Sequence, residues 1–176
     1  ILSPYGGAFK ASMGLSDKFP ERVKATPISE AAIVGISNGL ALGGYQPFAE
    51  IMFGDFLGLG MDQLVNHAAK FYYMYNKKIP CPVVIRTPMG GGRGYGPTHS
   101  QTLDKMLIGI DNLKVIALNL IIPPEDIYNT ILDTETQPVV VIENKLDYAR
   151  KHGVLSQKLI KDFRIESSMT KYPITR

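Results

Sequence analysis

An acidic residue at the start of an apolar stretch is the first candidate for chemistry in this sequence. Glu30 follows Ser29, which can cap a helix, and precedes a largely apolar run that ends at Gly43 and Gly44. A carboxylate in the first turn gains from the helix dipole and the unpaired backbone N–H groups, which is one explanation for it. The apolar neighbours favour another explanation, in which a carboxylate held near a low-dielectric wall awaits a partner.

A histidine and an arginine near a glycine-rich run are further candidates. His99 follows residues 90–97 and is suited to acid–base chemistry or to positioning a ligand, with a capping or structural histidine as the alternative. Arg93 lies inside the run and could meet an anionic substrate, or it could be a solvated arginine. The run does not have the glycine spacing of a phosphate-binding loop. The three histidines lack the spacing of a metal site, so we predict none in this chain.

Two aromatic residues follow a predicted strand and could meet a planar ligand. Phe53 is interpreted as core packing. Phe56 comes after Asp55, beyond the end of the strand, where its ring could stack on a heterocycle. A nucleophile–base pair of Ser29 and His99 is disfavoured, because no Gly-x-Ser-x-Gly turn frames the serine.

The elements that must position these residues alternate between strands and helices. Apolar runs predict strands at 47–53, 82–86, 113–117 and 139–142, with a short one at 22–25. Helices are predicted at 8–19, from Glu30 to Gly43 with most of its surface buried, at 61–75 with an amphipathic face, at 124–133, and at 155–163. This order predicts an α/β fold, a three-layer α/β/α architecture with a mainly parallel sheet. Ligands of such sheets bind beyond the carboxyl ends of the strands, so Glu30, Phe56 and the glycine-rich run are expected at one edge.

Composition and charge give no support for a nucleic-acid-binding or membrane protein. The chain has 176 residues, a net charge of +3 and one cysteine, Cys81. So small and scattered a charge favours neither nucleic acid nor membrane, and no apolar run reaches the ~20 residues of a membrane span. A lone cysteine, interpreted as a small buried hydrophobe, fits a reducing cytoplasm.

Several motifs in register give the sequence a specific resemblance. They are Thr26–Gly44, Glu50–Phe56, Asp62–Lys70, Arg86–Gly92 and His99–Gln101. In this order they resemble the pyrimidine-binding, transketolase-like domain of the thiamine-diphosphate-dependent 2-oxoacid dehydrogenases, in the β-subunit or fused single-chain form. The resemblance covers residues 5–148. It implies the thiamine-diphosphate-binding fold and oxidative decarboxylation of pyruvate or a branched-chain 2-oxo acid, with acyl transfer to a lipoyl group.

The resemblance also implies roles for individual residues. The carboxylate matching Glu30 hydrogen-bonds the aminopyrimidine ring of the cofactor and promotes loss of the proton on its thiazolium ring. The aromatic residue matching Phe56 stacks on the pyrimidine, and Met52 is expected to line the same pocket. His99 matches a histidine at the mouth of the site, near the incoming lipoyl arm. The cofactor carries the chemistry and the protein positions it.

The resemblance implies partners as well. Family members bind the diphosphate and its Mg²⁺ through a Gly-Asp-Gly motif on another domain, and this sequence has no such motif. We therefore expect a diphosphate-binding α domain or subunit, homologous β copies and a lipoyl-bearing acyltransferase as partners, and an inactive chain on its own. Residues 121–124 depart from the family pattern, which leaves a potassium site open. Residues 1–150 are expected to form the domain, without the family's first helix and strand, and 151–176 a linker toward a further domain.

Other functions stay open at this point. A transketolase-like two-carbon transferase is the related enzyme, and the order of residues 86–101 favours the dehydrogenase over it. An inactive structural or docking module is the non-enzymatic alternative. A nicotinamide-binding domain is disfavoured, because its glycine fingerprint is absent from the sequence.

Overall fold

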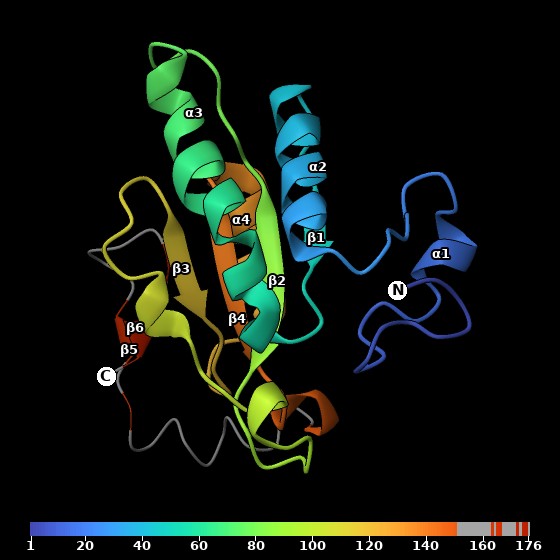
Figure 1. The fold of residues 1–176 in the computed structure, drawn as a ribbon. Coiled ribbons are helices and arrows are strands. Elements are labelled where there is room, and N and C mark those ends of the chain that lie inside the picture. Colours follow the sequence, from blue (N-terminus) through green and yellow to red (C-terminus); the bar gives the residue numbers. More distant parts are fainter. Residues whose placement is uncertain (151–162, 164, 167–171, 173, 176) are drawn as a thin grey trace.

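A parallel sheet forms the centre of the domain (Figure 1). The computed structural model describes residues 1–150, 163, 165–166, 172 and 174–175. The strands are β1 (Phe48–Glu50), β2 (Val84–Met89), β3 (Lys114–Ala117) and β4 (Val139–Asn144), in the order β1-β2-β4-β3 and all parallel. The strands predicted at 47–53, 82–86, 113–117 and 139–142 are thus confirmed. A separate antiparallel pair joins β5 (Ile165–Glu166) to β6 (Ile174–Thr175).

Helices cover both faces of the sheet, which confirms the predicted three-layer architecture. On one face lie α2 (Glu30–Leu42) and a helical segment made of η2 (Gln63–Ala68) and α3 (Ala69–Met74); α4 (Pro124–Thr134) lies on the other (Figure 1). The described residues include no helix long and apolar enough to cross a membrane.

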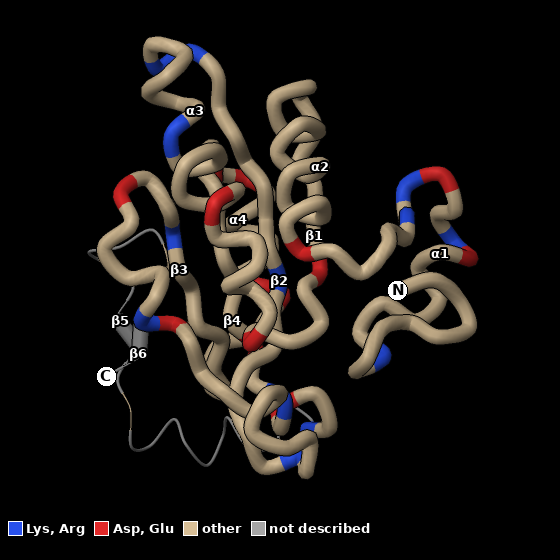
Figure 2. The backbone as a smooth tube through the Cα atoms, viewed as in Figure 1, with Lys and Arg blue, Asp and Glu red and all other residues tan. Residues whose placement is uncertain are grey.

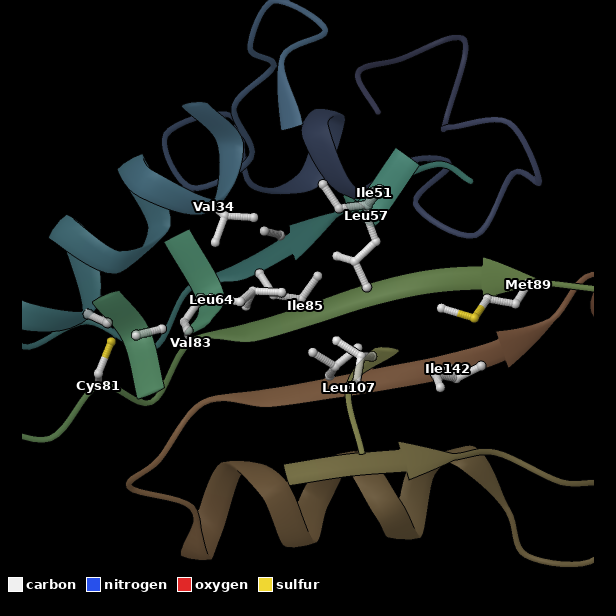
Figure 3. Close-up of a cluster of buried hydrophobic side chains, with 14 residues drawn as sticks. Val34, Ile51, Leu57, Leu64, Cys81, Val83, Ile85, Met89, Leu107 and Ile142 are labelled. Carbon is white, nitrogen blue, oxygen red and sulfur yellow. The ribbon is translucent and has the colours of Figure 1, made fainter. Parts of the chain in front are cut away.

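The strands are apolar on both faces because each face has its own core. Ile85 and Met89 of β2, and Val83 just before it, belong to one cluster with Val34 of α2 and Leu64 of η2 (Figure 3). The alternate residues pack on the α4 side, where the second cluster comprises Val84, Ile122, Ile127, Ile131, Val139 and Val141. Strands buried on both sides read as continuous apolar runs, which is why the sequence located them.

Helix α2 begins and ends where the sequence predicted, but its burial was predicted wrongly. Ser29 stands at the N-cap with an extended backbone, although its side chain makes no capping hydrogen bond. Only one stripe is buried, while Ile36 and Leu40 are 54 and 45% exposed on the other side. The apolar composition of α2 predicted that the rest of this chain would cover the helix. The structure instead leaves one apolar face of α2 exposed.

The predictions for the N-terminal segment were also wrong. Instead of a helix over 8–19, only α1 (Leu15–Lys18) is helical. Gly7, Lys10 and Gly14 adopt positive φ angles, which interrupt a right-handed helix. Residues 22–25 pair with no described strand, since charged Arg22 and Lys24 alternate with the few apolar side chains available for burial.

The amphipathic helix predicted over 61–75 is present with a local change of period. Gln63–Ala68 form a π-helical turn that continues into α3. Asn38 of α2 donates a hydrogen bond to the carbonyl oxygen of Gln63 at 2.8 Å. The helix predicted at 124–133 is α4, whereas most of the one predicted at 155–163 lies outside the described residues.

A buried group of charges joins three neighbouring strands on the α4 side. Arg86 of β2 donates two hydrogen bonds to Glu143 of β4, at 3.0 and 2.8 Å, and one to Glu50 of β1 at 3.2 Å. The hydroxyls of Tyr128 and Tyr148 donate to Glu143. Burial lowers the pKa of Arg86, but the charge and hydrogen bonds of Glu143 outweigh it and raise this pKa above its usual range. In Figure 2, Lys or Arg positions and Asp or Glu positions lie close together near β1 and β2.

Candidate active site at the carboxyl edge of the sheet

The segments that follow the strands gather at one edge of the sheet. After β1 comes η1 (Gly54–Gly60), after β2 the glycine-rich run with η3 (Pro97–His99), and after β4 comes η5 (Asp147–Ala149). The N-terminal end of α2 points toward this same edge (Figure 1). The edge is therefore where the candidates from three separate motifs can meet, as the parallel sheet predicts.

Glu30 occupies the first turn of α2, whose N-terminal end points toward this edge (Figure 1). Its residue is half-buried, and among the described residues its carboxylate has no hydrogen-bond or ion-pair partner. Gly60, at the end of η1, lies against the first turn of α2. A Cβ atom at Gly60 would be 3.3 Å from the carbonyl oxygen of Glu30 and 3.1 Å from a methyl group of Val34. A glycine here lets η1 approach the first turn of the helix closely.

Phe56 and His99 lie in contact with each other. Their ring centroids are 5.0 Å apart with the planes at 78°, and His99 contacts Phe53 in the same manner at 4.8 Å. Phe56 precedes Gly60 in the same 3₁₀ segment, and Gly60 lies against the turn that carries Glu30. The structure thus brings Phe56 and His99 into contact, and η1 links them to the first turn of α2.

Phe53 and Arg93 belong to an aromatic cluster beside this group. Phe53 makes edge contacts with Phe9 and Tyr95 at 5.7 and 5.5 Å. The guanidinium of Arg93 lies 5.3 Å from the Phe9 ring and donates to the carbonyl oxygen of Lys145 at 3.1 Å. Arg93 is therefore tied to the protein despite its exposure. Met52 is half-buried just beyond β1.

An ion pair between Asp55 and Lys145 beside the site was missed by the sequence analysis. The Oδ1 atom of Asp55 accepts hydrogen bonds from the backbone and side chain of Gln101, at 3.0 and 3.1 Å. The Oδ2 atom lies 3.5 Å from Nζ of Lys145, and the two side chains are 2 and 0% exposed. Lys145 directly follows β4 and Asp55 lies in the segment after β1, so the rule that strand ends meet at one edge could have identified them.

Burial and the charge of the partner shift the pKa of Asp55, and also that of Lys145, in opposite directions. Burial raises the pKa of Asp55, but hydrogen bonds from Gln101 and the charge of Lys145 outweigh it, so that this pKa is below its usual value. Burial lowers the pKa of Lys145, and the carboxylate of Asp55 opposes this shift only in part. The described part of the chain contains no cluster of three or more His, Cys, Asp or Glu residues placed to bind a metal.

The fold agrees with the comparison to known families. Residues 3–151 match the family described as transketolase, pyrimidine binding domain, and the chain belongs to this family. This confirms the resemblance that the sequence motifs indicated.

Three individual relatives are similar to this chain over most of its length. The chain is 38% identical over 143 residues to the acetoin:2,6-dichlorophenolindophenol oxidoreductase subunit beta of Cupriavidus necator. It is 35% identical over 144 residues to the 2-oxoisovalerate dehydrogenase subunit beta of Bacillus subtilis, and 34% over 165 residues to the mitochondrial pyruvate dehydrogenase E1 component subunit beta-2 of Oryza sativa subsp. japonica. These alignments cover 80, 81 and 93% of this chain but 41, 44 and 44% of the relatives, so the chain spans less than half of their length.

Proposed function

We propose that this chain supplies the pyrimidine-binding half of the active site in the decarboxylating component of a thiamine-diphosphate-dependent 2-oxoacid dehydrogenase. The substrate would be pyruvate or a branched-chain 2-oxo acid, and the acyl group would pass to a lipoyl group. The observation that carries the proposal is the half-buried carboxylate of Glu30, which has no partner among the described residues and stands in the turn of α2 against which the segment carrying Phe56 packs.

The residues at the edge fit the pyrimidine ring of the cofactor. A carboxylate without a protein partner can hold a proton at a ring nitrogen, and an aromatic face can cover a planar heterocycle. Glu30 and Phe56 would serve these two purposes, with Met52 lining the pocket. When bound, thiamine diphosphate supplies the carbanion chemistry that decarboxylation needs. His99 would act at the mouth of the site during acyl transfer, and Arg93 would attract the anionic substrate.

Assembly is part of the proposal. The diphosphate and its Mg²⁺ would be held by an α domain or subunit, and Glu30 must then lie at the boundary with that partner. The exposed apolar face of α2 supports this, since Ile36 and Leu40 extend from the same helix as Glu30. Homologous β copies and a lipoyl-bearing acyltransferase would complete the complex. Residues 1–150 would form the domain and 151–176 a linker. A cytoplasmic location suits the lone buried Cys81.

The test is turnover by the chain assembled with a diphosphate-binding α partner. Purified complex is given thiamine diphosphate, Mg²⁺ and pyruvate or 2-oxoisovalerate, and CO₂ release and lipoyl acylation are measured. We expect turnover of one of these acids by the complex and none by the chain alone. Glu30→Gln should abolish it, whereas Glu125→Gln should not, because Glu125 is an exposed carboxylate in the first turn of α4.

Acetoin cleavage is a second candidate, favoured by the 38% identity to the Cupriavidus necator protein. The same complex should then reduce 2,6-dichlorophenolindophenol with acetoin and release no CO₂ from either 2-oxo acid. Failure with all three substrates in a folded, cofactor-loaded complex would contradict the enzymatic proposal and favour a docking role.

A further inference from the structure

The Asp55–Lys145 ion pair is the most deeply buried charged feature near the site. The Lys145 side chain is fully buried and that of Asp55 is 2% exposed, although neither was assigned a function above. Asp55 follows β1 and Lys145 follows β4, two strands separated in the sheet by β2. The pair therefore bridges the ends of strands that do not touch each other.

Close packing brings Asp55 to this position. Gly54 lies against Met89 at the end of β2, and a Cβ atom at Gly54 would be 2.4 Å from Cγ of Met89. No side chain fits there without a shift, so the glycine lets η1 start directly over the end of β2. Asp55 is then held above that strand and reaches Lys145 on the far side.

The Asp55–Lys145 pair is hydrogen-bonded to two residues of the loop that carries His99, namely His99 itself and Gln101. The Nζ atom of Lys145 donates a hydrogen bond to the carbonyl oxygen of His99 at 2.6 Å, and Asp55 accepts two hydrogen bonds from Gln101. Arg93, farther back in the loop, donates to the carbonyl oxygen of Lys145. Gly90 at the start of the loop donates to Gln101 at 3.0 Å. The loop thus closes on itself, and its closure is fastened to these two buried charges.

We propose that Asp55 and Lys145 are positioning residues that set the place of the His99 ring against Phe56 and thereby the rate of acyl transfer. Two of the bonds go to the backbone on each side of Ser100, at the His99 carbonyl and the Gln101 N–H, so they fix where the histidine side chain begins rather than its protonation. This inference depends on the role proposed above for His99. A misplacement of a reacting group by ~1 Å can cost about 10²-fold in rate, so loss of either charge should be visible in transfer.

The first experiment measures the loop without using activity. Hydrogen exchange is followed in peptides covering residues 90–101 of the assembled complex. Lys145→Met, Asp55→Asn and the double variant should each exchange faster in this loop than the unmodified protein. The double variant removes both charges together, so a folded protein is available even when one unpaired charge prevents folding. Lys114→Met is the control, because it breaks an ion pair with Glu135 elsewhere and should leave the loop unchanged.

The second experiment is a double-mutant cycle on lipoyl acylation, with decarboxylation to an artificial electron acceptor measured in parallel. Lys145→Met should slow acyl transfer about ten- to hundredfold, with a much smaller effect on decarboxylation. In the His99→Ala background the same substitution should have no further effect, because the histidine it positions is gone. Lys145→Arg, which keeps a donor and a charge, should restore part of the rate.

Three other results would contradict parts of this proposal. Unchanged exchange in residues 90–101 would overturn the positioning of the loop. Faster exchange together with multiplicative effects of Lys145→Met and His99→Ala would overturn the link to the histidine and leave a structural ion pair. Normal acyl transfer in His99→Ala alone would refute the proposed role of His99, and the exchange data would still decide whether the pair holds the loop.

Discussion

Replacing Arg86 with methionine should remove a large part of the stability of this domain. The guanidinium makes two hydrogen bonds to Glu143 and one to Glu50, and the three side chains are 17, 9 and 12% exposed. Without it, two carboxylates share a poorly solvated site with no cation between them. Removing one partner of a buried ion pair costs about 3–5 kcal/mol, because the remaining charges keep their desolvation penalty.

The hydroxyls of Tyr128 and Tyr148 still donate to Glu143 in this variant, so we expect the lower part of that range. For a chain of this size, a loss of 3–4 kcal/mol corresponds to a Tm lower by about 6–16 °C. Thermal unfolding at neutral pH, followed by circular dichroism, measures the change. Arg86→Lys keeps the charge without the planar fork and should lose less.

Arg150→Met provides the control, because Arg150 pairs with Asp147 on the surface at 3.0 Å. Exposed pairs contribute about 0–1 kcal/mol, so its Tm should hardly change. A Tm for Arg86→Met that matches the Arg150→Met value would refute the reasoning, since it would mean that the buried carboxylates do not need the guanidinium.

Three further outcomes follow from the contacts. Phe56→Ala should weaken cofactor retention in the assembled enzyme by about 1–3 kcal/mol through lost burial and stacking, and equal affinity by calorimetry would count against the assignment. Gly54→Ala should lower stability by about 1–3 kcal/mol because its Cβ would overlap Met89, and an unchanged denaturation midpoint would show that the site can adjust. Burial raises the pKa of Cys81 to about 11, so stability should fall as pH rises from about 9 to 11, where the unfolded thiol ionises and the folded one does not; rapid labelling of the native thiol at pH 8 would contradict this.

The sequence predicted an element correctly where its residue pattern has one usual structural consequence. Strands buried on both faces appear as apolar runs, and a capped apolar run with terminal glycines defines α2. Phe56 and His99 lie in segments that follow neighbouring parallel strands, so their contact followed from the rule that strand ends share an edge. Glu30 follows no described strand and reaches this edge through the N-terminal end of α2.

The features that the sequence analysis missed depend on pairing across the chain. Arg86 with Glu143, and Asp55 with Lys145, are buried only because strand order and register bring them together. An apolar helix face also looks the same whether it is covered by its own chain or left open, which is why the burial of α2 was overestimated. Positive φ angles at Gly7 and Lys10 turned a predicted helix into turns, and local composition did not indicate them.

Exchange of the thiazolium C2 proton tests the central claim most directly. The measurement uses thiamine diphosphate bound to the assembled enzyme, with unmodified protein, Glu30→Gln and the control Glu125→Gln. If Glu30 addresses the aminopyrimidine ring, exchange in Glu30→Gln should be slower by about 10²–10⁴-fold while Glu125→Gln stays at the unmodified rate. Exchange at the unmodified rate in Glu30→Gln, with cofactor bound, would contradict the account.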